Sequence, residues 1–105
     1  MTGFKLDARA RLSIELALTA ASGDSVFIRQ QEKDAKALGM TGAEIDMARS
    51  GSSFDFQLSR AIALALTIND ERRARATRAG LGAQVCADIE TMATSYMDRS
   101  LLKSA

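Results

Sequence analysis

The stretch Leu12-Ser-Ile-Glu-Leu-Ala-Leu18 determines the fold that the sequence predicts. Its residues are apolar on nearly every face of a helix, and a helix of this kind is central and mostly buried. Asp7 is suited to cap the start of this helix and Gly23 to end it, so a helix is predicted from about Asp7 to Ala21. The chain is therefore predicted to build a helical domain around this segment.

Capping residues and glycines divide the rest of the chain into five further predicted helices. They run from Asp24 or Ser25 to Leu38, from Thr41 to about Ser50, from Ser52 or Ser53 to Ile68, from Glu71 to Arg78, and from Ala83 to Leu102. No linker or low-complexity tract separates them. The predicted fold class is all-α, with about six helices in a single domain that covers residues 1–105.

Local sequence signals also predict caps and packing. Thr41-Gly-Ala-Glu44 is a capping box, Gly39 is suited to a left-handed helix end, and Asn69 or Asp70 is suited to cap the fifth helix. A second apolar run, Ala61–Leu66, has small residues that permit close approach, so the first and fourth helices are predicted to pair in the core. In the second helix, the charged half from Arg29 to Lys36 is predicted to face water. A stripe at helical spacing in the last helix predicts core or subunit interface: Val85, Ile89, Met92 and Tyr96.

Composition argues against several kinds of chemistry. The chain of 105 residues has no histidine and one cysteine, Cys86. Without histidine it lacks the usual general base near neutral pH and the commonest metal ligand, so we expect no metal or other cofactor. One cysteine cannot form an internal disulfide or a dithiol pair. Cys86 is interpreted as a small buried hydrophobic residue, and the alternative is a reactive thiol that the start of the last helix activates.

Charge and hydropathy bear on location and partners. The longest apolar run, Ala61–Ile68, is far shorter than the roughly 18–20 residues that cross a bilayer. The segment Met1–Asp7 lacks the apolar core of a secretory signal. The net charge of +1 gives no global attraction to nucleic acid. The sequence therefore predicts a cytoplasmic protein without membrane or nucleic-acid partners.

Three segments carry a resemblance to a known family: Glu15–Gly23, Asp24–Gly39 and Thr41-Gly-Ala-Glu-Ile45. Their pattern resembles the alkyl hydroperoxidase D-like and carboxymuconolactone decarboxylase family. In the family, a buried helix with a glutamate leads through a small-residue turn into the next two helices. The resemblance extends in pattern over about residues 8–95 and implies the family's helical fold. It also implies a homo-oligomer, commonly a trimer or hexamer.

The family's Cys-x-x-Cys-x-x-x-His motif is missing from the matching positions. Counting back from Gly39 places Asp24 and Phe27 where the family has its cysteines, and Gln31 where it has its histidine. Thiol peroxidases need a reactive thiolate and a second thiol that resolves the sulfenic acid. Only Glu15 matches a working residue, the family's proton-relay group. The resemblance therefore implies a divergent member without thiol peroxidase chemistry.

Glu15 is the main candidate for acid–base chemistry. A carboxylate in so apolar a helix would be costly to bury unpaired, and burial would raise its pKa. The structural alternative is an ion pair with Arg11, one turn earlier, or with an arginine of another helix. The candidate catalytic residues are Glu15 and Gln31, and the candidate ligand-binding residues are Asp24, Phe27 and Arg11.

Three functions stay open at this point. The first is a small-molecule binder or scaffold with a pocket near Glu15. The second is a lyase of the carboxymuconolactone decarboxylase type, in which Glu15 is the acid/base and Arg11 or Arg29 holds the carboxylate of a small substrate. The third is a helix-turn-helix DNA-binding protein. Against the third, Glu44 and Asp46 near the start of the recognition helix would repel DNA phosphates.

The run Glu71-Arg-Arg-Ala-Arg-Ala-Thr-Arg78 carries four arginines. Such runs usually form a solvated helix face, and this interpretation is favoured, together with ion pairs between subunits. An anionic ligand or partner is the alternative.

Overall fold

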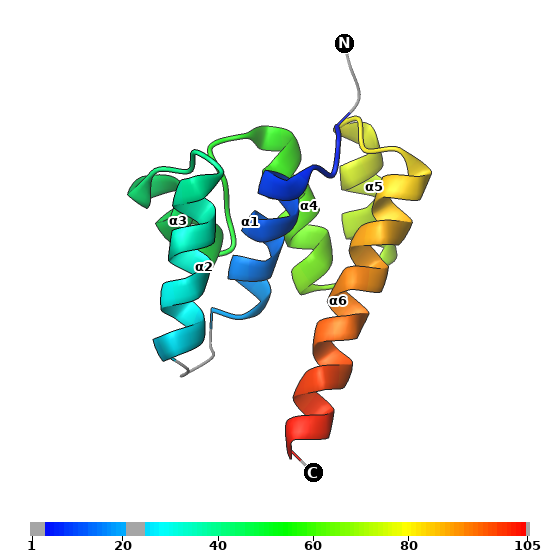
Figure 1. The fold of residues 1–105 in the computed structure, drawn as a ribbon. Helices are drawn as coiled ribbons and strands as arrows, with labels where there is room; N and C mark the ends of the chain where they lie inside the picture. The colour runs from blue at the N-terminus through cyan, green and yellow to red at the C-terminus, as the bar shows by residue number, and fades with distance from the viewer. Residues whose placement is uncertain (1–3, 21–24, 105) are drawn as a thin grey trace.

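Six helices make up the described part of the chain, which contains no strand. The computed structural model describes residues 4–20 and 25–104, with residues 97–104 described as backbone only. The helices are α1 (Ala8–Leu18), α2 (Ser25–Ala37), α3 (Gly42–Arg49), α4 (Phe56–Leu66), α5 (Asp70–Arg78) and α6 (Ala83–Ser104) (Figure 1). The predicted all-α class is confirmed.

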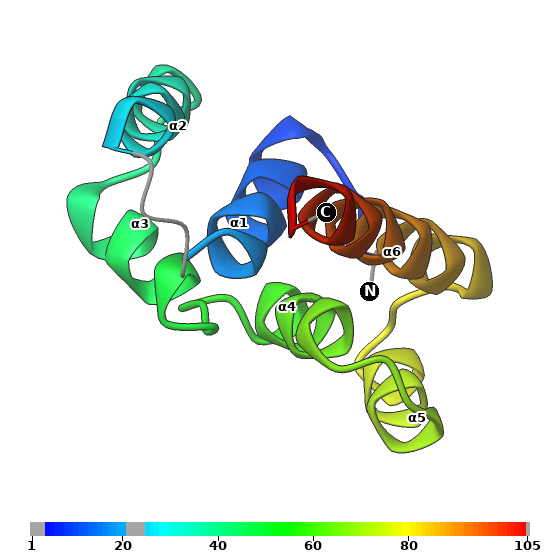
Figure 2. The same cartoon turned by 90° about the horizontal axis from the view of Figure 1, so that it is seen from below.

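Helices α1 and α4 pack together at the centre of the molecule. Helices α2 and α3 pack against α1 on one side, whereas α5 and α6 pack against α4 on the other (Figure 1, Figure 2). The predicted pairing of the first and fourth helices is therefore confirmed. The Cα atoms extend over 38 × 34 × 18 Å, so the molecule is flat, and the carboxy-terminal part of α6 extends past the other helices.

Buried apolar residues form two clusters that meet at α1. The larger cluster joins α1, α4, α5 and α6 and includes Ile14 and Leu64. The smaller cluster joins α1 to α2 and α3 and includes Leu16 and Ile45. Because α1 contributes to both clusters, it is apolar on nearly every face. This explains the stretch Leu12–Leu18 and confirms that α1 is central.

Several predicted caps are confirmed. Asp7 caps α1, Asn69 caps α5, and both hydrogen bonds of the capping box between Thr41 and Glu44 are present at the start of α3. Gly39, which follows α2, has a φ of +87°. This left-handed conformation is the one that a glycine accommodates at a helix end.

The predicted cap and end of the fourth helix are wrong. Asp55 caps α4 in place of Ser52 or Ser53, because its Oδ1 accepts hydrogen bonds from two backbone N–H groups of the first turn. The Ser53 hydroxyl instead accepts the backbone N–H of Asp55 at 3.1 Å. The helix ends at Leu66 and not at Ile68.

The first helix is shorter than predicted. It ends at Leu18, because the backbone of Thr19 (φ −107°, ψ 9°) departs from helical geometry. The Thr19 backbone N–H and hydroxyl both donate to the carbonyl of Glu15 in the last turn. The predicted end at Ala21 and the breaker Gly23 lie outside the described residues. The remaining differences are one or two residues in size: Ala37 in place of Leu38, Asp70 in place of Glu71, and Ser104 in place of Leu102.

The sequence predicts that the charged half of α2 faces water, but one face of this half is buried. Gln31 is only 4% exposed and Ala35 is fully buried, whereas Val26 in the first turn is 77% exposed. Residues four positions apart lie on one face of a helix. The buried face of α2 therefore runs through the charged half, and the charged side chains occupy the other faces.

Within the part of the chain that the structure describes, no helix combines the length and the apolar composition that a membrane span requires.

Candidate functional site

Gln31 lies buried where α2 meets the end of α1. Its Nε2 donates to the Thr19 hydroxyl over 2.9 Å, and that hydroxyl donates to the backbone carbonyl of Glu15 over 2.7 Å. Gln31 is thus linked to the backbone of Glu15 and not to its carboxylate. Because an amide and a hydroxyl do not exchange protons readily near neutral pH, this network fastens α2 to α1 and provides no general base.

Glu15 is partly buried, and its carboxylate is not paired with Arg11. The Arg11 Nε instead donates to the backbone carbonyl of Leu6 over 3.2 Å. Among the residues that the structure describes, no hydrogen bond or ion pair engages the Glu15 carboxylate. The ion-pair alternative that the sequence offered for Glu15 is therefore wrong within this part of the chain.

Of the two remaining residues of the predicted site, the structure describes one. Asp24 lies outside the described residues, and Phe27 is 38% exposed in the first turn of α2. The pockets described below are lined by neither Glu15 nor Gln31. A shared pocket at these residues stays a prediction.

A pocket of about 500 Å³ lies where residues 4–7, α1, α3 and the loop before α4 meet. We call it the amino-terminal pocket. Its volume falls within the roughly 300–1,000 Å³ of small-molecule sites. Its apolar lining residues are Phe4, Ala10, Met40, Ala48, Phe54 and Leu58. Its charged lining residues are Lys5, Asp7, Arg9, Glu44 and Asp55.

An ion pair between Arg9 and Glu44 fixes α1 to α3 at the amino-terminal pocket. The other carboxylate oxygen of Glu44 accepts the backbone N–H of Thr41 over 3.1 Å. The Thr41 N–H and the Arg9 guanidinium hold the pKa of Glu44 below its ordinary value. The buried Ser13 hydroxyl donates to the carbonyl of Arg9 over 2.9 Å. These bonds join three of the polar residues that line the pocket, which are Arg9, Ser13 and Glu44.

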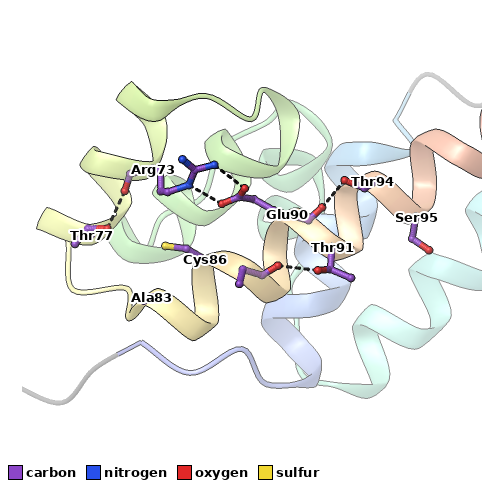
Figure 3. A pocket seen from close by; sticks show the side chains of 9 residues that line it. Arg73, Thr77, Ala83, Cys86, Glu90, Thr91, Thr94 and Ser95 are labelled. Carbon is purple, nitrogen blue, oxygen red and sulfur yellow. Dashed lines mark hydrogen bonds and ion pairs between the residues drawn. The ribbon is translucent and has the colours of Figure 1, made fainter.

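A more open groove of about 750 Å³ lies along α5 and α6 (Figure 3). The Arg73 guanidinium donates to both Glu90 carboxylate oxygens, over 2.8 and 2.7 Å. The hydroxyls of three lining threonines donate to carbonyls one turn earlier in their own helices: Thr77, Thr91 and Thr94. These polar side chains are already engaged within the protein, so the groove offers a ligand few free partners.

Cys86 is 2% exposed and belongs to the larger core cluster. Burial raises the pKa of the Cys86 thiol above its ordinary value. The thiolate, which is the reactive form, is therefore disfavoured near neutral pH. This agrees with the interpretation of Cys86 as a small hydrophobic residue.

Glu90 is expected to make the fold sensitive to acid. Its hydrogen bonds to Arg73 hold the pKa of Glu90 below the ordinary value of 4.5. A carboxylate with a lowered pKa in the folded state stabilises fully above the unfolded-state pKa, and this stabilisation is lost as the pH falls through the folded-state pKa. We therefore expect the free energy of unfolding to decrease below about pH 4.5. Urea unfolding at a series of pH values measures this.

The matched variants for this experiment are Glu90→Gln and Glu71→Gln. Glu90→Gln removes the titration and is expected to lower the stability at pH 7 and to flatten its decrease in acid. Glu71 belongs to an exposed pair with Arg75, so Glu71→Gln is the control. An acid profile of Glu90→Gln that matches the wild type would contradict the role of this ion pair.

The would-be recognition helix α3 packs into the protein. Ile45 and Ala48 are buried, and Arg49 donates to Glu32 of α2 over 2.9 Å. The exposed face carries Asp46. A helix with a paired arginine and an exposed carboxylate is poorly suited to DNA phosphates.

Sequence reasoning did not find Lys5, Arg9 or Phe54 as lining residues of a pocket. The capping box marked Glu44, but its partner Arg9 lies 35 residues earlier, and no local signal joins the two. Comparisons of the chain with protein-family models, with curated proteins and with solved structures found no match. The protein is all-α, and its family, its assembly into a trimer or hexamer and its cytoplasmic location stay predictions.

Proposed function

We propose that this chain is a catalytically divergent member of the alkyl hydroperoxidase D-like and carboxymuconolactone decarboxylase family that binds a small molecule without thiol peroxidase chemistry. The amino-terminal pocket is the proposed binding site. The observation that carries the proposal is its combination of about 500 Å³ of space with both apolar and charged lining residues. Pockets with these properties are the usual small-molecule sites of proteins.

Two features support a function without peroxidase chemistry. Gln31, at the position of the family's histidine, has its amide bonded to Thr19 and cannot act as a base. The thiol of Cys86 is buried and has a raised pKa. A peroxidatic thiol needs the opposite properties, since it reacts as an accessible thiolate.

Phe54 provides the sharpest test of the pocket. A panel of small carboxylic acids, lactones and amines is titrated into the protein, and backbone amide shifts are followed by NMR. We expect shifts to cluster at residues 4–10, at Glu44 and at Phe54. Because a fully covered aromatic ring contributes about 1.5–3 kcal/mol, Phe54→Ala is expected to weaken binding about tenfold.

Phe56→Ala is the matched control for this experiment. Phe56 is 61% exposed and Phe54 is 68% exposed, but only Phe54 lines the pocket. Phe56→Ala is therefore expected to leave the affinity unchanged. An equal loss of affinity in the two variants, or no binding by any molecule of the panel, would contradict the proposal. Shifts centred on Glu15 and Gln31, with a lactone activity that Glu15→Gln abolishes, would favour the lyase instead.

A further inference from the structure

Three arginines of α4 and α5 converge on a small cavity apart from the pockets above. Its volume is about 90 Å³, and its lining residues are Arg60, Ala63, Arg72 and Arg75. Helices α4 and α5, which carry these residues, contact each other (Figure 2). No carboxylate is among the lining residues in the part of the chain that the structure describes. The cavity exceeds the roughly 10–15 Å³ that one water needs, so a small polar group can enter.

Contacts within the protein hold two of these guanidinium groups in place. Arg72 Nη1 donates to the backbone carbonyl of Ala63 over 2.5 Å. The Arg60 guanidinium carbon lies 5.0 Å from the centre of the Phe56 ring. A guanidinium has more N–H donors than one such bond uses, and contact of its face with a ring leaves the donors at its edge available. Both groups are therefore held in position with donors to spare.

The charges around the cavity are unbalanced. Glu71 pairs with Arg75 over 2.6 Å, but the two side chains are 70% and 52% exposed. Exposed ion pairs of this kind contribute little to stability, so Arg75 can exchange Glu71 for another anion. Asp70, which precedes Glu71 in the chain, pairs with Arg73. The three lining arginines together with Glu71 leave a net charge of +2.

We propose that Arg60, Arg72 and Arg75 bind the phosphate group of a small phosphorylated molecule. A phosphate monoester carries about −1.5 to −2 charges near neutral pH, which matches this surplus better than a carboxylate does. The fork of a guanidinium also matches the geometry of two phosphate oxygens. The exposed Phe56 ring beside Arg60 provides an apolar surface for the rest of the molecule. This site shares no lining residue with the amino-terminal pocket and does not depend on the proposed function.

Titration of the full chain with inorganic phosphate and with pyrophosphate tests the site. The arginine Nε–Hε resonances are followed by NMR at low ionic strength. We expect saturable shifts at Arg60 and Arg72, and an affinity about tenfold lower in Arg60→Gln and in Arg75→Gln. Arg60→Lys keeps the charge but loses the fork and is also expected to bind more weakly. Arg29→Gln removes the same charge from an exposed position of α2 and is expected to bind as the wild type does.

Equal losses in Arg29→Gln and Arg60→Gln would show that net charge alone attracts the anion and would overturn the site. Shifts that do not saturate would do the same. Titration with a single-stranded oligonucleotide without a terminal phosphate tests the alternative that this surface binds nucleic acid. If it binds more tightly than pyrophosphate and depends on Arg60, the surface belongs to nucleic acid and the proposal fails. Thermal unfolding of Arg75→Gln, whose side chain is exposed, checks that the fold is intact.

Discussion

Replacing Leu64 by alanine is expected to lower the free energy of unfolding by about 2–5 kcal/mol. Leu64 is fully buried in α4, within the cluster that joins α1, α4, α5 and α6. The shorter side chain would leave a cavity that the surrounding helices close only in part, and the lost contacts add to the lost burial. Since domains of this kind have about 5–15 kcal/mol of stability in total, the loss is a large share.

Leu66→Ala is the matched control for Leu64→Ala. It is the same substitution in the same helix, but Leu66 is 41% exposed. Its expected cost is below about 1 kcal/mol, because an exposed side chain leaves little cavity. Urea unfolding followed by circular dichroism measures both values. Similar costs for the two variants would contradict the described orientation of α4.

Gly80→Ala is expected to cost about 1–3 kcal/mol. Gly80 follows α5 with a φ of +105°, in the left-handed region that residues with a side chain rarely adopt. The N–H of Leu81 donates to the carbonyl of Ala76 over 3.1 Å and closes the helix end. A Cβ at position 80 would lie 2.7 Å from Nε2 of Gln57, which donates to the carbonyl of Ala79 over 2.8 Å. The substitution would therefore strain the backbone and disturb a bond between α4 and the end of α5.

Gly82→Ala separates this effect from a general loss of glycine. A Cβ at Gly82 meets no atom within 4 Å, and Gly82 is not among the glycines with positive φ. Gly82 lies directly before α6, at a cap position where alanine is less favourable than glycine, so its expected cost is about 0.5 kcal/mol and stays below that of Gly80→Ala. Thermal or urea unfolding measures the stability of the two variants. A Gly80→Ala variant as stable as Gly82→Ala would show that the turn after α5 differs from the one described.

The candidate site was harder to predict than the fold. Resemblance to a family directed attention to Glu15 and Gln31, but the structure uses Gln31 to bond Thr19 across a helix contact. For the run Glu71–Arg78 the sequence favours a solvated helix face. That interpretation fits Arg75, which is exposed beside Glu71, but it does not describe Arg72, which bonds to a carbonyl of α4.

The sequence by itself determined the helices, most of their caps and the central place of α1. Each of these depends on residues within a few positions of one another, as in the box from Thr41 to Glu44 or the left-handed turn at Gly39. The apolar stretch Leu12–Leu18 likewise indicates, from neighbouring residues alone, that other helices pack around its helix. Spacing along one helix is sufficient for predictions of this kind.

Only the tertiary structure decided which side chains meet. Arg9 reaches Glu44, and Arg60 shares a cavity with Arg72, because helices distant in sequence pack side by side. Such pairings depend on how the helices cross and on which rotamers fit between them. Periodicity within a helix places a residue on a face, but it does not specify which face of another helix lies opposite. The amino-terminal pocket and the arginine cavity therefore became visible only in the folded chain.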